Sequence, residues 1–347
     1  MNEAERLTLI TDIEAQRNAR VLTLVTGDRQ GHETRLARDV IPLVYDHLRT
    51  FEHVSEIDLF LYTPGGDTLA AWGLVSLIRE YCDRFVVVVP FRCHSAGTLI
   101  GLGADEILVA PGGQLGPIDP SVSSPYNPAP PGVPVQAGGR ITLLPVSVED
   151  MLGFLHLAKN EAGLKSEEQM AQVLGLMADK VHPLALGAVY RAREHVNAFA
   201  RSLLRTHMDS EPRIEMIVDY LAKLPTHSYI ISRKEALTVF GEDFVKPLEP
   251  ELEPTVWRLY KLYERWFQLT DPYSADAILG ADNVVTVTFP RASLESREGE
   301  QLKSHVFRTR KELSRIQVTQ PGMGAPIPGI QERIITEGWT NWPEGES

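Results

Sequence analysis

The chain of 347 residues has little cysteine, a deficit of basic charge and no long apolar run. Its two cysteines, Cys82 and Cys93, exclude a disulfide framework and favour a reducing compartment. The 34 basic and 46 acidic residues give a formal net charge of −12, which argues against general nucleic-acid binding and against docking on anionic lipid. The most apolar stretch, Phe85 to Phe91, is far shorter than the about 20 residues of a membrane span.

The N-terminal residues, Met1 to Arg6, contain neither a basic region nor an apolar segment of a secretory signal. A hydrophobic content of 43% is ordinary for a globular protein, and a chain of this length can bury a large core without disulfides. We therefore expect a cytoplasmic protein without a membrane span.

The first third of the chain alternates between strand and helix patterns. The run of β-branched residues at 85–89 does not alternate, which is typical of a strand buried on both faces of a parallel sheet. The other strands are expected at 21–25, 57–62 and 106–110, and the helices at 35–49, around 74–81 and at 95–104. This order predicts a layered α/β core with right-handed crossovers.

The sequence pattern changes twice in the rest of the chain. Residues 123–139 form a turn-rich loop, and helical patterns follow it up to about residue 206, including a capping box at Ser166 and Gln169. Further elements are expected as a strand at 227–231, a helix at 233–240, strands at 284–289 and within 303–318, a proline- and glycine-rich segment at 321–328, and a segment without a clear period at 330–347. We interpret 1–282 as one domain with an insert at 123–210, and 283–347 as a C-terminal β-containing extension that could form an oligomer interface.

Two loops stand out because each follows a predicted strand, where open α/β sheets bind ligands. The first runs from Thr63 to Asp67 and contains Gly65 and Gly66, which expose unobstructed backbone N–H groups. The second places Ser95 at a strand-to-helix turn, a setting that favours developing negative charge. An N–H group of the glycine pair and that of Ala96 could form an oxyanion hole for a nucleophilic Ser95.

Each loop also has an ordinary structural interpretation. A Pro-Gly-Gly turn is common, and a serine at a helix start is usually an N-cap. Neither the Gly-x-Ser-x-Gly elbow nor a phosphate-binding loop is present. The spacing of the two loops is more specific than either alone, because Ser95 lies 29 residues after Gly66 with one helix and one strand between them.

With this pattern the sequence resembles the Clp-protease/crotonase superfamily, and within it the signal peptide peptidase A branch of serine peptidases. The stretch from Tyr62 to Val122 carries the likeness. The segment His182-Pro183-Leu184-Ala185-Leu186-Gly187 is similar to a narrower group, the serine dehydrogenase proteinases of prokaryotes. The likeness covers about 20–122 and, weakly, 184–245. It implies a Clp/crotonase-like layered α/β fold with a helical insert.

The resemblance implies a role for each matching position. Ser95 matches the nucleophile, and Gly66 with Gly65 and Ala96 matches the oxyanion-hole backbone. Clp-type proteases carry a histidine base on the segment where this chain has Asp119, so the Clp-type triad is not supported. Signal peptide peptidases use a downstream lysine, for which Lys159, Lys165 and Lys180 are the candidates.

The choice of base stays open at this point. Lys180 lies at the edge of the apolar stripe of its helix, just before a long helix, so burial could lower its pKa toward that of a usable base. Lys159 has a similar position on its own helix. His182, with Asp119, could form a Ser-His-Asp set in another chain order, although a histidine before a proline is often structural.

We therefore expect an ATP-independent serine peptidase without cofactor or metal, since neither a nucleotide-binding loop nor metal-ligand spacing is apparent. Its partners would be a peptide or protein substrate and further copies of itself, because relatives of this family form rings or stacked oligomers. Two alternatives are a crotonase-like acyl-CoA enzyme, which needs no serine nucleophile, and a catalytically degenerate scaffold of a protease or defence assembly.

Overall fold

The computed structural model describes residues 3–122, 125–128, 144, 146–318 and 327–342. The chain divides into two compact units. We call Met1–Leu115 with Ile231–Ser347 the sheet unit, and Gly116–Ile230 the helical unit.

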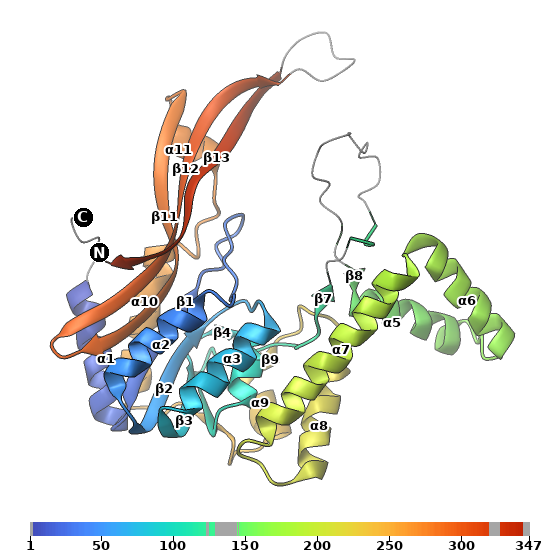
Figure 1. The fold of residues 1–347 in the computed structure, drawn as a ribbon, viewed down its shortest axis with the longest axis horizontal. Helices are drawn as coiled ribbons and strands as arrows, with labels where there is room; N and C mark the ends of the chain where they lie inside the picture. The colour runs from blue at the N-terminus through green and yellow to red at the C-terminus, as the bar shows by residue number, and fades with distance from the viewer. Residues whose placement is uncertain (1–2, 123–124, 129–143, 145, 319–326, 343–347) are drawn as a thin grey trace. The chain divides into compact units, whose positions relative to one another are not determined.

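An eight-stranded sheet forms the centre of the sheet unit (Figure 1). The five strands at one side of the sheet pair in parallel, and the three at the other side pair antiparallel. In spatial order the strands are β10 (Val245–Pro247), β5 (Glu106–Val109), β3 (Cys82–Val89), β2 (Val54–Tyr62), β1 (Arg20–Thr26), β11 (Val284–Glu298), β12 (Gln301–Val318) and β13 (Ile327–Trp342).

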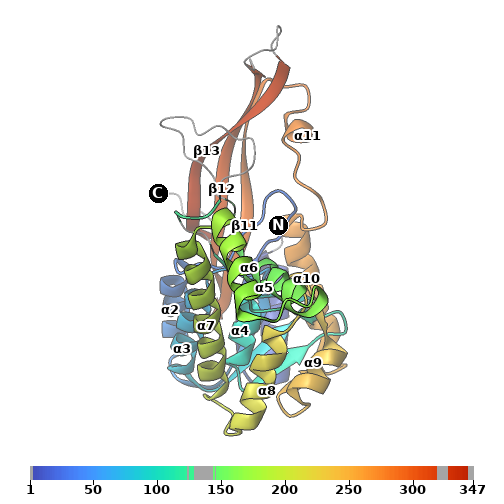
Figure 2. The same ribbon diagram turned by 90° about the vertical axis from the view of Figure 1, so that its right-hand side faces the viewer.

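Helices cover both faces of the parallel part of this sheet (Figures 1 and 2). On one face lie α1 (Glu3–Arg17) and α10 (Glu253–Phe267), and on the other lie α2 (Val40–Phe51), α3 (Thr68–Arg79) and α4 (Ala96–Leu102). Side chains therefore leave the central strands into two apolar layers, and every residue of the Phe85 to Val89 run is buried. The predicted layered α/β fold is confirmed.

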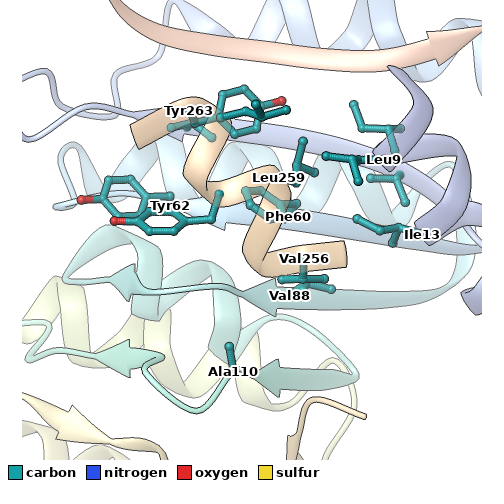
Figure 3. Close-up of a cluster of buried hydrophobic side chains, with 14 of the residues drawn as sticks. Leu9, Ile13, Phe60, Tyr62, Val88, Ala110, Val256, Leu259 and Tyr263 are labelled. Atoms are coloured by element: carbon teal, nitrogen blue, oxygen red, sulfur yellow. The ribbon is translucent and has the colours of Figure 1, made fainter. Parts of the chain in front are cut away.

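The core beneath α1 and α10 consists of interlocking aliphatic and aromatic side chains (Figure 3). Leu9 of α1 and Leu259 of α10 pack over Phe60 of β2, and all three are at most 4% exposed. One ion pair is enclosed in this core. The guanidinium of Arg6 donates to both oxygens of Glu295 on β11, at 2.9 Å each.

The three antiparallel strands extend the sheet beyond β1. β11 pairs with β1 from Ala292 to Ser296, and β12 pairs with both β11 and β13. Residues 283–347, expected as a separate extension, thus belong to the same compact unit as the core. The expected boundary at 282 and the oligomer interface stay predictions. Most of the proline-rich segment at 321–328 lies outside the described residues.

The helical unit consists mainly of helices. Its described elements are β7 (Ser121–Val122), β8 (Val146–Ser147), α5 (Val148–His156), the π-helical turn η1 (Leu157–Glu161), α6 (Glu167–Lys180), α7 (Pro183–Leu204) and α8 (Glu211–Ala222). The predicted capping box opens α6, where Ser166 accepts from the Gln169 N–H and the Gln169 side chain accepts from the Ser166 N–H. Most of the loop expected at 123–139 lies outside the described residues.

Several elements differ from the sequence expectations. Helices α1, α8 and α10 and strand β13 were not predicted. The prediction of a strand at 227–231 is wrong, because only Ile231–Ser232 (β9) is extended and paired. The remaining elements are β4 (Arg92–Cys93), β6 (Gln114–Leu115), α9 (Arg233–Phe240) and α11 (Ala275–Leu279). Among the helices of the described ranges, none combines the length and the apolar character that crossing a bilayer requires.

Candidate active site

The two loops singled out in the sequence are joined at Thr63, directly after β2. The Thr63 N–H donates to the carbonyl of Arg92, and the His94 N–H donates to the carbonyl of Thr63, both at 3.0 Å. The Thr63 hydroxyl oxygen also accepts from the Gly65 N–H at 3.0 Å. Gly97 permits this approach, since a Cβ there would lie 2.5 Å from the Thr63 methyl carbon. The end of β2 and the turn that carries Ser95 therefore form one hydrogen-bonded unit.

Ser95 has a backbone conformation that is rare for a residue with a side chain. Its φ is 53° and its ψ is −112°, directly before the first residue of α4. Such a conformation costs about 1–3 kcal/mol and persists where the surroundings enforce it. The Ser95 hydroxyl makes no capping hydrogen bond to α4, so the N-cap interpretation does not hold. A strained strand-to-helix turn is also how α/β-hydrolases present a nucleophilic serine.

Gly65 packs directly against this turn. A Cβ built on Gly65 would lie 2.6 Å from the Ser95 Cβ and 3.2 Å from the Ser95 Oγ, and Gly65 has a φ of +107°. Gly66 faces Leu36 instead, where a Cβ would lie 2.0 Å from the Leu36 carbonyl oxygen. Both positions therefore require glycine, for close approach and for backbone conformation.

The backbone pairing at Leu36 sets the direction of the Gly66 peptide groups. The Leu36 N–H donates to the Gly65 carbonyl, and the Leu36 carbonyl accepts from the Asp67 N–H, both at 2.8 Å. In a parallel ladder of this kind, the N–H of the intervening Gly66 points to the opposite side. In the part of the chain that the structure describes, the N–H groups of Gly66 and Ala96 have no hydrogen-bond acceptor. Both donors are therefore unpaired, with Gly66 half-buried and Ala96 fully buried.

The thiol near Ser95 is not a competing nucleophile. Cys93 is fully buried, and burial raises the pKa of its thiol well above the ordinary value. A buried neutral thiol is unreactive. The second cysteine, Cys82, is also buried, which raises its pKa to about 12. Ser95 is half-buried and lies on the loop itself.

The three candidate lysines lie in the helical unit, and all are exposed. Lys180 ends α6 and Lys159 lies in η1, while Lys165 precedes α6. Lys180 is exposed within the helical unit, and the expectation that it reaches a semi-buried site stays a prediction. Water could be displaced from the Lys180 ammonium group only by a bound substrate or by a neighbouring element.

His182 has a structural position at the start of α7. Its Nδ1 accepts from the Leu184 N–H at 3.1 Å, which makes it the N-cap of the helix, and Pro183 follows as the first helical residue. The imidazole also stacks on Tyr126, with ring centroids 4.8 Å apart. Its Nδ1 is therefore used as a hydrogen-bond acceptor for the helix end.

Asp119 is paired with His227, which lies in the segment expected to form a strand. Its Oδ2 lies 3.1 Å from the Nδ1 of His227, and no contact between Asp119 and His182 occurs among the residues described. The Asp119 side chain is 17% exposed and that of His227 is 46% exposed. The suggested partnership of His182 with Asp119 is thus replaced by Asp119 with His227. The two residues are 108 positions apart in sequence, so no local pattern could reveal the pair.

A cavity of about 620 Å³ adjoins Asp119 within the helical unit. Its walls include the apolar residues Ile118, Leu152, Val196 and Leu221, together with Arg193. Such a volume lies in the range of ligand-binding sites. In the parts of the chain with described placement, no cluster of three or more His, Cys, Asp or Glu side chains could hold a metal ion.

The described fold is a layered α/β structure that carries a candidate serine nucleophile at the Ser95 turn. Residues 1–136 match the family described as the ClpP-like SDH-type serine proteinase. This match confirms the resemblance for that part of the chain, which contains Gly65, Gly66, Ser95 and Ala96.

Two uncharacterized proteins of Methanocaldococcus jannaschii are similar to this chain, with 32% identity over 126 residues and 29% over 128. Each alignment covers 34% of this chain, and 42% and 43% of the respective relative. The chain therefore spans about two-fifths of the length of the curated relatives it matches.

Two structures of the 1510-N membrane-bound stomatin-specific protease share 15% identity with the chain. One is an alanine mutant and the other is a second alanine mutant in complex with a substrate peptide. The TM-scores are 0.33 and 0.34, with 67% and 62% of this chain and 80% and 71% of those chains covered.

Proposed function

We propose that this protein is an ATP-independent serine peptidase of the signal peptide peptidase and Clp class, in which Ser95 is the nucleophile. The observation that carries the proposal is the strained turn at Ser95, packed against Gly65 and next to two unpaired backbone donors. The match of residues 1–136 to a serine proteinase family supports the same chemistry.

The reaction would proceed by acyl transfer. The Ser95 Oγ attacks the carbonyl carbon of the scissile peptide bond, and its proton passes to a general base. The negative charge on the former carbonyl oxygen is stabilised by the N–H groups of Gly66 and Ala96. The base then returns the proton to the leaving amine, and water hydrolyses the ester that remains on Ser95.

Lys180, His182 and Lys159 are the candidates for the general base suggested by the sequence, and His227 is a further candidate. A histidine base works best when a carboxylate orients its imidazole, and Asp119 lies at hydrogen-bond distance from His227. Lys180 and His227 are both exposed, and His182 caps α7.

Cleavage of a fluorogenic peptide library tests the activity. Wild-type protein should cleave some members, and Ser95→Ala should lower the rate by about 1,000-fold or more. Ser76→Ala is the matched control, because Ser76 is an exposed serine on α3 of the same unit. The proposal fails if Ser95→Ala retains the wild-type rate. Hydrolysis of acyl-CoA thioesters without peptide cleavage would favour the crotonase-like alternative.

Three conservative variants identify the base. His182→Asn keeps a good N-cap side chain, so it tests the imidazole without removing the helix cap. His227→Gln and Lys180→Met complete the set. The variant of the true base should approach the rate of Ser95→Ala, while the other two stay within about tenfold of wild type. Equal, small losses in all three would exclude each of these side chains as the base.

We also infer that the protein forms homo-oligomers. Large apolar side chains are exposed on α6 and α7, including Leu174, Leu176, Leu184 and Tyr190, at 49–61% exposure. Large exposed apolar side chains can be removed from water by association with another copy of the chain. Sedimentation equilibrium of the full chain should give a mass of at least twice the 38.6 kDa of one chain. A monomer at all concentrations would contradict this inference.

A further inference from the structure

The hydroxyl group of Thr63 connects the end of β1 to the glycine pair. Thr63 is fully buried. Its hydroxyl oxygen accepts two hydrogen bonds, from the Gly65 N–H at 3.0 Å and from the Thr26 hydroxyl at 2.6 Å. Because a hydroxyl oxygen has two acceptor lone pairs, both are occupied. This oxygen therefore holds neighbouring groups of the protein and is not free to bind a substrate.

Gly65 is held at both of its backbone polar groups. Thr63 accepts from its N–H, and the Leu36 N–H donates to its carbonyl at 2.8 Å. In a trans peptide group, a carbonyl and the N–H of the next residue point in opposite directions. The direction of the Gly66 N–H therefore follows from the backbone dihedrals of Gly65. Glycine has no Cβ to restrict these dihedrals, so the two hydrogen bonds supply the restraint.

Thr26, the donor to the Thr63 oxygen, is in turn held by the antiparallel strands. It pairs with Ala292 of β11, and the N–H of the next residue, Gly27, donates to the Arg291 carbonyl at 2.8 Å. The Thr26 side chain is buried, so water does not compete for its hydroxyl. Strand β11 thus fixes the residue that orients the Thr63 hydroxyl.

We propose that Thr63 is a positioning residue of the peptidase, which acts through Gly65 to direct the Gly66 N–H toward the oxyanion. Thr26 acts one step further away, by orienting the Thr63 hydroxyl. This inference rests on the proposed function, because it assigns both threonines to the support of the oxyanion hole. Neither threonine contacts the substrate or takes part in the proton transfers.

Loss of the Thr63 oxygen would leave the buried Gly65 N–H without its acceptor. Because an unpaired buried donor is unfavourable, Gly65 would rotate toward another acceptor and turn the Gly66 N–H away from its present direction. Complete loss of one oxyanion donor lowers kcat by about 100- to 1,000-fold. Misdirection of the same donor should lower kcat by at least about tenfold. The KM should change little, because the oxyanion forms only after the substrate has bound.

Steady-state kinetics on a fluorogenic peptide that the wild type cleaves tests the role of Thr63. Thr63→Ser keeps the hydroxyl and loses only the methyl group, whereas Thr63→Ala loses both, so the comparison isolates the oxygen. We expect Thr63→Ser to stay within about threefold of the wild-type kcat and Thr63→Ala to fall at least about tenfold below it, with KM within about threefold in both.

Thr23→Ala is the matched control. It removes another buried hydroxyl of β1, which lies 2.9 Å from the Tyr263 hydroxyl and has no contact with the glycine pair. It should lower the free energy of unfolding but keep the wild-type kcat, which separates positioning from a general loss of stability.

A double-mutant cycle tests the link to Thr26. If Thr26 acts only through the Thr63 hydroxyl, Thr26→Ala should lower kcat by about threefold or more in the wild-type background and have no further effect in the Thr63→Ala background. Two independent effects would instead multiply in the double variant.

Equal kcat values for Thr63→Ala and Thr63→Ser would overturn the proposal, as would multiplied effects in the double variant. If Thr63→Ala does not fold, a wild-type kcat in folded Thr26→Ala is decisive against it, and a lowered kcat with an unchanged KM supports it. A wild type that cleaves no peptide refutes the proposed function and this inference with it. By contrast, unaffected variants of an active wild type refute only the role of the threonines.

Discussion

The contact between Gly65 and Ser95 predicts a large effect of a single methyl group. In Gly65→Ala, the new Cβ would lie 2.6 Å from the Ser95 Cβ and 2.9 Å from the His94 carbonyl oxygen. Carbon atoms prefer 3.5–4.0 Å, so the Ser95 turn would have to move by roughly 1 Å. The φ of +107° at Gly65 adds a cost of about 1–3 kcal/mol for alanine. A displacement of 1 Å at a reacting atom lowers rates by about 100-fold.

Covalent labelling by a fluorophosphonate, followed over time, measures this effect without knowledge of the natural substrate. We expect Gly65→Ala to react about 100-fold more slowly than wild type. Gly112→Ala is the control, because a Cβ there meets only the Phe91 ring, at an ordinary 3.8 Å. Circular dichroism must show that both variants are folded. A folded Gly65→Ala protein that reacts at the wild-type rate would refute the proposed packing of the nucleophile.

Two further predictions concern stability. Arg6→Met should destabilise the protein by about 3–5 kcal/mol in denaturant unfolding, because it leaves the Glu295 carboxylate buried without its cation. The control Arg258→Met removes an exposed ion pair and should destabilise the protein by at most about 1 kcal/mol. Equal losses of stability in the two variants would contradict this prediction. His47 is buried against His305, and burial lowers its pKa to about 3, so the folded protein holds it neutral while the unfolded chain takes up a proton below about pH 6.5. The contribution of neutral His47 to the free energy of unfolding is fully present above about pH 6.5. It declines as the pH falls, by about 2 kcal/mol at pH 5. Unfolding between pH 8 and 5 should show this decline in wild type and a smaller one in His47→Gln, and equal declines would exclude His47 as the source.

The sequence predicted the parallel core well because its strands are buried on both faces and its helices are amphipathic. Helix α1 was missed because Arg6 and Glu14 lie on its buried face, which breaks the apolar pattern. Strand β13 was missed for a different reason. It lies at the edge of the sheet and is exposed along most of its length, so it shows no alternation. Helix α10 carries a clear apolar stripe that includes Val256, Leu259 and Tyr263, so its signal was present in the sequence.

The candidate site was only partly predictable. The glycine pair and Ser95 were evident because close backbone approach and tight turns require particular residue types at particular positions. The strained φ of Ser95 and the contact with Gly65 depend on the packing of two loops and have no local signature. The Asp119–His227 pair joins segments far apart in the chain, so proximity rather than spacing creates it.

The identity of the nucleophile is tested most directly by locating the fluorophosphonate adduct. After labelling of the wild-type chain, trypsin digestion and fragmentation mass spectrometry identify the modified residue. The account predicts one adduct, on Ser95 in the peptide that follows Arg92, and no adduct in Ser95→Ala. A folded protein that stays unlabelled, or that carries the label on another residue, would contradict it.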